Sequence, residues 1–362
     1  MMNGLGRILA SETNVSDLLA YFTEEDPTPW AGLIGSTPAR VTREGRARSE
    51  NRADLLLMGA SGETIGAVEV KLGHHLSPKQ SEWYTSTFGA EVTLLLASLD
   101  PVSPRDEHPD SRWSANLLPD LVSRWKGSSN SEVSVLAAAA ERVLSEWSAL
   151  ITSVSTGSKG KDAEPVESIS DPFLGRILTR ALKPAVLEGS AESAYPGVTS
   201  GGGNALLQAW RAFPGKPDRH DAITEVRWQP SRRIMDFRFG VDVTKGGRAG
   251  REAAWELATT LDSAIRVDSF SAYLEGVDQA RAGLLSSARG TGRPTKKGNW
   301  ADIVEKGFRH GDASQYNPGF YRDGDRRFEA SARIDTSRAT GPDLVALLDH
   351  ALVYLTEQLS VK

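Results

Sequence analysis

Asn51-Arg-Ala-Asp-Leu-Leu-Leu-Met58 and Ile65-Gly-Ala-Val-Glu-Val-Lys-Leu72, separated by a turn rich in small residues, predict two apolar strands joined by a hairpin. Alternate side chains of a strand face opposite ways, so Glu69 and Lys71 share one face and the valines beside them share the other. We expect Asp54 of the preceding strand next to the charged face. Two carboxylates and an ammonium on one sheet face are the groups that a hydrolytic site with a divalent metal requires.

The chemistry of such a site explains why charges would be placed in an apolar strand. Charged groups there are costly unless they are paired or bound to a metal. Mg²⁺ usually takes one or two protein carboxylates and several waters, so Asp54 and Glu69 are the expected ligands, with the backbone carbonyl of Val70 as a third oxygen. Lys71 would orient the attacking water or stabilise charge on the phosphate. The alternative is that Lys71 only pairs with Glu69 or Asp54 at a strand end.

The segments around the hairpin predict helices on either side of it and a further strand. Ser77 and Pro78 have the residue types of an N-cap and a first helical position. Residues 91–97, Glu-Val-Thr-Leu-Leu-Leu-Ala, predict a strand. Residues 11–22 predict a helix whose apolar residues recur at helical spacing and would pack on the sheet.

Over about residues 10–100 this order of elements resembles the PD-(D/E)xK nuclease superfamily. The resemblance implies an α/β fold with a restriction-endonuclease-like mixed sheet flanked by helices. It implies that Asp54 and Glu69 are metal ligands and that Lys71 is the catalytic lysine. One departure is that Ala53, not a proline, precedes Asp54.

Two further residues match the family and also have structural explanations. Gln80 matches a glutamine that many members carry on the next helix, which makes it a candidate catalytic residue. The pair Ser77 and Gln80 also forms a capping-box pattern, and both explanations can hold together. Glu12 matches the first-helix glutamate that helps to bind metal in many members, and it is equally a carboxylate favoured by the helix dipole.

The resemblance also implies a cofactor and partners. Mg²⁺ is the expected metal, with Mn²⁺ as a substitute. Nucleic acid is the expected substrate, DNA rather than RNA, in restriction or in bacterial defence against phage. A homodimer that cuts both strands and a partner protein of a defence system are compatible with such a nuclease.

Length and composition set the broad class. A chain of 362 residues predicts two domains, and 25% charged with 39% hydrophobic residues is typical of globular proteins. No apolar run approaches the roughly 20 residues that span a bilayer. The absence of cysteine excludes disulfides, thiolate catalysis and cysteine-bound metals. We therefore expect a cytoplasmic protein that does not enter a membrane.

Arginines gather near the hairpin although the net charge of the chain is −5. A local basic patch is sufficient for phosphate contacts, and we expect nucleic acid to be bound by Arg43, Arg46, Arg48 and Arg52. The alternative is a charged edge strand that prevents aggregation. A second basic run, residues 289–298, is followed by Trp300 and is either a phosphate-binding segment or a solvated loop.

The rest of the chain predicts helices at 115–126 and 131–151 and a linker at 156–165. The expected domains are therefore 1–155, nuclease-like, and 170–362, an α+β domain for recognition, sensing or partner binding. In the second domain the expected elements are a helix at 173–187, strands at 222–228 and 233–241 around a Gln-Pro-Ser turn, a helix at 251–264, a strand at 326–334 and a helix at 344–355. Charged residues on the paired strands are expected on a solvent face or in cross-strand pairs: Glu225, Arg227, Asp236 and Arg238.

Three hypotheses about function follow. The first is a Mg²⁺-dependent endonuclease that hydrolyses phosphodiester bonds. The second is a catalytically inactive nuclease-fold protein that binds nucleic acid or a partner. The third is a partner-binding protein in which the spacing of Asp54, Glu69 and Lys71 is accidental, and it predicts no metal between the two carboxylates.

Overall fold

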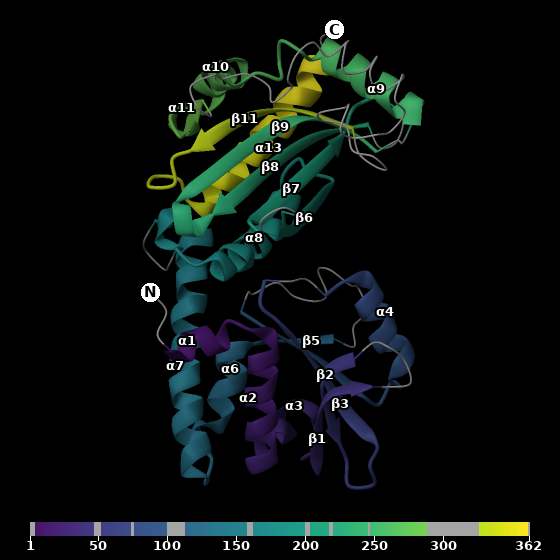
Figure 1. The fold of residues 1–362 in the computed structure, drawn as a ribbon, viewed down its shortest axis with the longest axis vertical. Coiled ribbons are helices and arrows are strands. Elements are labelled where there is room, and N and C mark those ends of the chain that lie inside the picture. Colours follow the sequence, from purple (N-terminus) through teal and green to yellow (C-terminus); the bar gives the residue numbers. More distant parts are fainter. Residues whose placement is uncertain are drawn as a thin grey trace. The chain divides into compact units, whose positions relative to one another are not determined.

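The computed structural model divides the chain into two compact units (Figure 1). The first holds Met1–Thr152 and Arg176–Ala181, and the second holds Ser153–Gly175 and Leu182–Lys362. The structure describes residues 4–46, 52–73, 76–99, 113–157, 162–199, 203–216, 220–244, 247–287 and 326–360. Among these residues, every helix is too short or too polar to pass through a bilayer.

The first unit contains a five-stranded mixed sheet in the order β1-β2-β3-β4-β5. The β1–β2 and β2–β3 pairs are antiparallel, and the β3–β4 and β4–β5 pairs are parallel. The strands are β1 (Arg40–Arg46), β2 (Arg52–Met58), β3 (Thr64–Lys71), β4 (Thr93–Ser98) and β5 (Trp113–Leu117). This mixed sheet with its helices confirms the general α/β class, whereas the restriction-endonuclease-like topology stays a prediction.

Helices flank this sheet, with α2 and α4 on opposite sides of it (Figure 1). The helices in this part of the chain are α1 (Gly4–Leu9), α2 (Glu12–Glu25), η1 (Thr28–Trp30), α3 (Ala31–Ile34), α4 (Pro78–Thr87), α6 (Leu118–Ser123), η2 (Arg124–Gly127) and α7 (Ser131–Ser155). The predicted helices at 11–22, at Ser77–Pro78 and at 131–151 are confirmed, as is the β2–β3 hairpin.

One predicted helix of the first unit is partly wrong. The range 115–126 was expected to be helical throughout, but its first residues belong to β5, which pairs in parallel with β4. The helix α6 begins only at Leu118, with Pro119 in its first turn. Pairing with β4 is a long-range contact that the local pattern of residues does not encode, so tertiary structure overrides the helical signal there.

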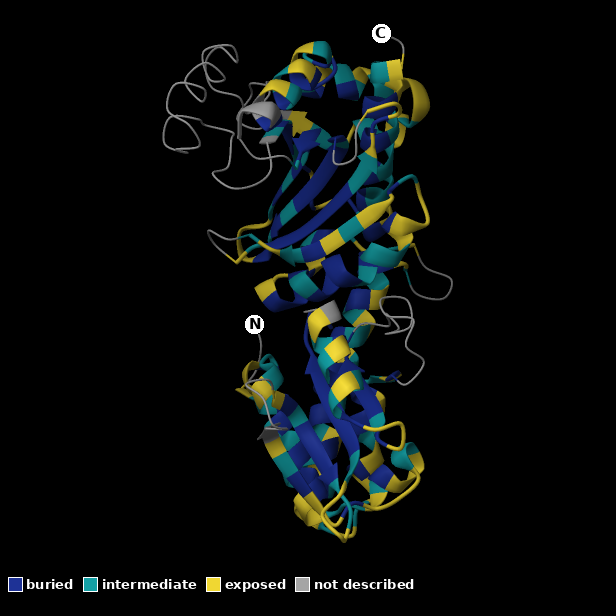
Figure 2. Ribbon diagram, turned by 90° about the vertical axis from the view of Figure 1, so that its right-hand side faces the viewer, coloured by how far each residue is buried: buried dark blue, intermediate teal, exposed yellow. Residues whose placement is uncertain are grey.

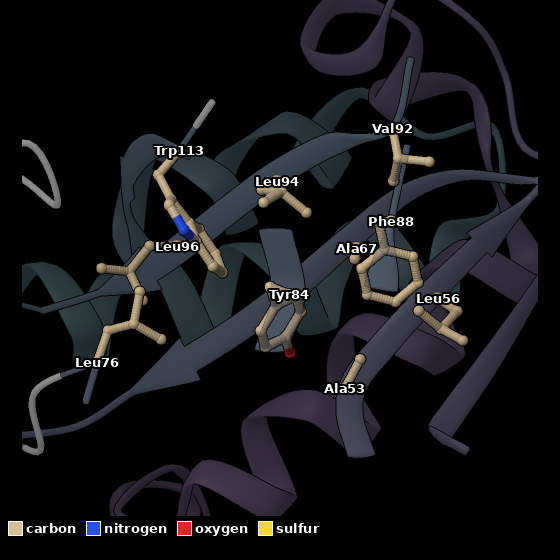
Figure 3. Packing of buried hydrophobic residues seen from close by; sticks show 10 residues of the cluster. All are labelled: Ala53, Leu56, Ala67, Leu76, Tyr84, Phe88, Val92, Leu94, Leu96 and Trp113. Atoms are coloured by element: carbon tan, nitrogen blue, oxygen red, sulfur yellow. The ribbon is translucent and has the colours of Figure 1, made fainter. Parts of the chain in front are cut away.

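The helix α4 covers one face of the sheet through an aromatic cluster (Figure 3). Tyr84 lies in the middle of this cluster, and its ring centroid is 5.0 Å from that of Trp113 and 5.7 Å from that of Phe88. Ala67 of β3 and Leu94 of β4 are fully buried in the same cluster. Because α4 packs on one face and α2 on the other, β3 is buried on both faces (Figure 2). The charged face of β3 is therefore interior.

The second unit contains a six-stranded antiparallel sheet in the order β10-β11-β9-β8-β7-β6. Its strands are β6 (Ser193–Val198), β7 (Ala205–Ala212), β8 (His220–Gln229), β9 (Ile234–Val243), β10 (Leu285–Ser287) and β11 (Arg326–Ile334). The helices of this region are η3 (Val166–Ser168), α8 (Pro172–Leu187), η4 (Pro230–Arg232), α9 (Gly247–Thr260), α10 (Val267–Val277), α11 (Gln279–Ala282) and α13 (Gly341–Ser360). The predicted strand pair around the Gln-Pro-Ser turn is confirmed.

One face of this second sheet is apolar and packs on helices. Phe237 and Phe239 of β9 pack against Phe270 of α10, with ring centroids 5.7 and 4.8 Å away. Tyr354 of α13 packs on the same phenylalanine at 5.5 Å. Residues that alternate with the β9 phenylalanines therefore point to the opposite face of the sheet.

The charged residues of β8 and β9 form cross-strand pairs, as expected, but Glu225 does not face solvent. It is 1% exposed and is held by Arg227 and Gln208. The sequence pattern gave no sign of this burial, because alternation shows which side chains share a face but not which neighbouring side chains cover them.

Candidate metal and hydrolysis site

The strands β2 and β3 part at the position of Asp54. Their pairing runs from Met58 back to Leu55 and does not extend to the next residue of β2. The carboxylate of Asp54 fills the opening, because its Oδ2 atom accepts a hydrogen bond of 2.7 Å from the backbone N–H of Val70. Asp54 is thereby fixed beside the charged face of β3.

Glu69 is the centre of the site. It is 2% exposed, and three side chains donate to it. Lys71 Nζ lies 2.5 Å and Gln80 Nε2 lies 3.0 Å from its Oε1 atom, and Tyr84 Oη lies 2.5 Å from its Oε2 atom. A carboxylate offers about four lone-pair positions, so these donors leave capacity on Oε2.

Gln80 forms the capping box that its sequence position indicated, and its side chain also reaches Glu69. Its backbone N–H donates to Ser77 Oγ at 3.1 Å, and its Oε1 atom accepts from the Ser77 N–H at 3.3 Å, which completes a capping box. Its amide nitrogen is then left to donate to Glu69. The residue that caps the start of α4 therefore also contacts the buried carboxylate.

Tyr84 was not identified from the sequence. It follows Gln80 by four residues, so both side chains lie on the same face of α4. This spacing was the available signal, but it has meaning only once α4 is known to cross the charged face of β3. Burial and the nearby negative charge of Glu69 raise the pKa of the Tyr84 hydroxyl well above its usual value. Tyr84 therefore remains a proton donor at neutral pH.

Burial and the charge of Glu69 raise the pKa of Asp54 to about 7. Glu69 thus lies close enough to oppose the ionisation of Asp54. Burial alone would lower the pKa of Lys71, but the carboxylates of Glu69, Glu12 and Asp54 raise it. Lys71 is therefore a cation at neutral pH.

Glu12 lies at the start of α2 and reaches the loop after β3. Its Oε1 atom accepts a hydrogen bond of 2.7 Å from the backbone N–H of Leu72. Its charge raises the pKa values of Asp54 and Lys71. The structure thus brings Glu12 to the edge of the site, where it holds the residue that follows Lys71.

The residues present fit a hard divalent cation. Within the described ranges, no three His, Cys, Asp or Glu side chains form a group that could hold a metal ion by themselves. Mg²⁺, however, is commonly held by one or two carboxylates and completes its shell with water. Asp54 and Glu69 supply only oxygen atoms, and a cation between them would relieve the repulsion that raises the pKa of Asp54. A role for the Val70 carbonyl stays a prediction, since the structure shows Val70 bonded through its N–H.

The arginines near the hairpin lie on an edge. The strand β1 lies at one edge of its sheet, as the charged-edge alternative expected. Arg43 is exposed and pairs with Asp17 of α2. Arg52 begins β2 and is exposed. The side chain of Arg46 and the whole of Arg48 lie outside the described residues, as does the basic run 289–298 with Trp300.

Comparison of the chain with protein-family models, with curated proteins and with solved structures finds no match. The nuclease resemblance therefore stays a prediction from Asp54, Glu69 and Lys71.

Proposed function

We propose that the first unit is a metal-dependent phosphodiester hydrolase, an endonuclease of the PD-(D/E)xK type, acting on DNA. The observation that carries this proposal is the convergence of Asp54, Glu69 and Lys71 at the point where β2 and β3 part. Buried charges are costly, and such clusters of perturbed groups gather at functional sites.

Asp54 and Glu69 would hold Mg²⁺ or Mn²⁺, which lowers the pKa of a bound water and neutralises charge on a phosphoryl oxygen. The protein's own groups prepare the site. Gln80 and Tyr84 orient Glu69 through both of its oxygen atoms. Lys71 keeps its proton and presents a positive charge beside the carboxylates, where it would stabilise negative charge that develops on the phosphate.

The choice of nucleic acid as substrate is supported by Arg52, which is exposed at the start of β2, two residues before Asp54. Arg43 is also exposed, but it pairs with Asp17 and lies in register with Leu55 and Val68, on the face opposite Glu69. Positive side chains beside a hydrolytic centre attract a phosphate backbone. DNA rather than RNA, pairing of two copies and a place in bacterial defence rest on the family resemblance alone.

A second candidate is an inactive nuclease-fold protein that binds nucleic acid or a partner. The observation in its favour is that Lys71, Gln80 and Tyr84 already donate hydrogen bonds to both carboxylate oxygens of Glu69. A site satisfied in this way is stable without metal. In that case Asp54 and Glu69 would persist for structural reasons, and Mg²⁺ would neither bind nor promote cleavage.

A cleavage assay distinguishes these candidates. Plasmid, linear duplex, single-stranded DNA and RNA would each be incubated with Mg²⁺, Mn²⁺ or chelator. We expect metal-dependent cleavage that falls by at least about 100-fold in Asp54→Ala and in Lys71→Ala, since each removes a group acting on the reacting phosphate.

Two exposed residues of α4 provide matched controls, Glu82→Ala for the lost carboxylate and Lys79→Ala for the lost ammonium. Both should cleave like the wild type. Equal cleavage in all four variants would identify a contaminating nuclease and refute the proposal. Binding of nucleic acid without cleavage under any metal would support the inactive candidate.

A further inference from the structure

The second sheet carries a charged face that the proposed hydrolysis does not use. Residues directly opposite each other in a sheet share a face, and the pairs Glu225–Arg238 and Arg227–Asp236 join β8 to β9. The same face continues onto β11. Four arginines lie on it, and they are named here the arginine face: Arg227, Arg238, Arg327 and Arg333.

Each of these arginines is bonded to a carboxylate on the same face. Arg227 bonds to Glu225, and Arg238 bonds to Glu329. The remaining two pairs are Arg327 with Asp242 at 3.0 Å and Arg333 with Asp236 at 2.6 Å. A guanidinium has five N–H donors in a rigid fork, and one carboxylate accepts at most two of them. The carboxylates therefore fix the orientation of Arg227 and Arg238 and accept from only some of the N–H groups of these two side chains.

The charges are arranged in layers. In every pair the arginine side chain is more exposed than its carboxylate, for example 25% for Arg227 against 1% for Glu225 and 35% for Arg333 against 19% for Asp236. The acidic groups form the floor, and the guanidinium groups form the surface that solvent reaches. An approaching molecule thus meets donors first, which suits an anion.

Ion pairs of this kind are a poor source of stability. Burying charges carries a desolvation cost, and an apolar replacement of similar volume is often neutral or stabilising. The opposite face of the same sheet shows that apolar packing is available here, since Phe237 and Phe239 pack on helices. The arginine face is therefore better explained by recognition than by folding.

Two aromatic side chains border the arginine face. Trp210 of β7 donates from Nε1 to Asp242 at 2.9 Å, which places it on this face. Tyr195 of β6 lies opposite Gln208, whose amide donates to Glu225, so it shares the face and is 44% exposed. The ring of Tyr195 lies against Gly197, which is in register with Arg227 two strands away, about 10 Å at the usual strand spacing. That span separates the base of a nucleotide from its phosphates.

We propose that the arginine face binds a small phosphorylated nucleotide, with its phosphates on Arg227 and Arg238 and its base against Tyr195 or Trp210. An arginine side chain binds a phosphate group through two parallel N–H···O hydrogen bonds, and aromatic rings stack on bases. Asp221 lies opposite Asp242, so five carboxylates share this face with the four arginines, and the face lacks the net positive charge that attracts a long polyanion. A free nucleotide therefore fits better than a nucleic acid.

Isothermal titration calorimetry of the full chain tests the proposal. The probes are ATP, GTP, cyclic di-GMP, inorganic phosphate and a single-stranded DNA 12-mer, all with chelator present so that metal-dependent binding is absent. We expect at least one nucleotide to bind. Arg227→Lys keeps the charge but loses the fork, and Tyr195→Ala loses the ring. Each should weaken binding about tenfold or more, a change of about 1.4 kcal/mol.

Matched controls come from the same unit. Arg232→Gln alters an exposed arginine of the neighbouring turn, and Val198→Ala alters an exposed residue on the other face of β6. Both controls, and Asp54→Asn, should bind the nucleotide within about twofold of the wild type. Loss of binding in Asp54→Asn alone would place the nucleotide in the first unit and overturn the proposal.

Three other results would also overturn it. These are no binding of any nucleotide, nucleotide binding that is unchanged in Arg227→Lys and Tyr195→Ala, and binding of phosphate or of the 12-mer that is tighter than that of every nucleotide. None of these outcomes depends on cleavage activity, so the nucleotide proposal and the proposed nuclease can fail separately.

Discussion

Glu69 is a carboxylate inside an apolar strand, and three side-chain donors compensate its two oxygen atoms. Two of them, Gln80 and Tyr84, come from α4 and are fixed by the packing of that helix. The third, Lys71, comes from the same strand. The donors on α4 therefore set the orientation of Glu69 independently of the charge beside it, which makes their separate contributions measurable.

Tyr84→Phe should destabilise the protein by about 2 kcal/mol, because hydrogen bonds to charged groups are worth about 1.5–3 kcal/mol. It should also raise the Mg²⁺ concentration needed for half-maximal cleavage, since Glu69 loses a donor that orients it. Urea unfolding and a metal titration measure the two effects. Tyr354→Phe is the matched control, because its hydroxyl donates to the backbone carbonyl of Ala264 at 3.3 Å. Tyr354→Phe should lower the free energy of unfolding by about 1 kcal/mol and leave the metal titration unchanged.

Asp54 gives a prediction about pH. Its pKa is about 7 in the folded protein and about 4 in an unfolded chain, so the folded state binds the proton more tightly. The stability of the metal-free protein should then fall as pH rises from about 4 through about 7. Asp54→Asn removes this pH-dependent loss of stability. At pH 8 its free energy of unfolding should exceed that of the wild type by about 1–3 kcal/mol.

The same pair of proteins tests the metal site. Adding Mg²⁺ at pH 8 should raise the melting temperature of the wild type and leave that of Asp54→Asn unchanged, because the variant lacks a ligand. Thermal unfolding at pH 5 and pH 8, with and without Mg²⁺, provides all the comparisons. A variant that is less stable than the wild type at pH 8 without metal would contradict the assigned repulsion between Asp54 and Glu69.

At the scale of elements, the sequence predicted what local chemistry determines. The cap at Ser77 and the β2–β3 hairpin were predictable because their signals lie within a few residues. The strand β5 was missed because only its pairing with β4 defines it. Asp54, Glu69 and Lys71 could be placed on one face because alternation within strands is a local signal. Tyr84 could not be added to them, because its place in the site depends on how α4 packs on the sheet. The burial of Glu225 likewise depends on side chains from three other strands, Gln208, Arg238 and Arg327.

Gly240 in the middle of β9 shows such a long-range requirement. A Cβ atom at this position would lie 2.0 Å from the backbone oxygen of Phe328 on β11. Gly240→Ala should therefore separate β9 from β11 and destabilise the protein by more than about 3 kcal/mol, since backbone atoms cannot move aside as a side chain can. Circular dichroism during urea unfolding would measure the loss.

Gly276 in α10 is the matched control, because a Cβ atom there would meet no atom within 4 Å. Gly276→Ala should leave stability unchanged or raise it by up to about 1 kcal/mol, the difference in helix propensity. Similar stability of both alanine variants would show that the close approach of β11 to β9 is not required.

At the scale of the whole molecule, the two units are not two consecutive pieces of sequence. The first unit includes Arg176–Ala181, a part of α8, although the linker predicted at 156–165 would have assigned this segment to the second domain. Composition locates a polar linker but does not reveal that the chain returns to the first unit after it. A boundary chosen from sequence alone would therefore remove part of the unit that holds the candidate site.

This return of the chain yields a prediction about fragments. Gly73, two residues after Lys71, has a φ of +81°, and a Cβ atom on it would lie 2.9 Å from Cβ of Arg176 and 3.0 Å from the backbone nitrogen of Ile177. Arg180 in the same segment is fully buried. The segment thus supports the loop that Glu12 also holds through Leu72. Without it, the end of β3 loses a neighbour on which Lys71 depends for its position.

A fragment of residues 1–155 should therefore melt at least about 5 °C below a fragment of residues 1–187, the shift expected for about 1–2 kcal/mol in a unit of this size. Its Mg²⁺-dependent cleavage should also fall at temperatures where the fragment is still folded, because Lys71 directly precedes the unsupported loop. Differential scanning fluorimetry and the cleavage assay, both below the lower melting temperature, separate these effects. Equal melting temperatures and equal cleavage in the two fragments would mean that Arg176–Ala181 contributes nothing to the site, and that the boundary inferred from composition is sufficient for function.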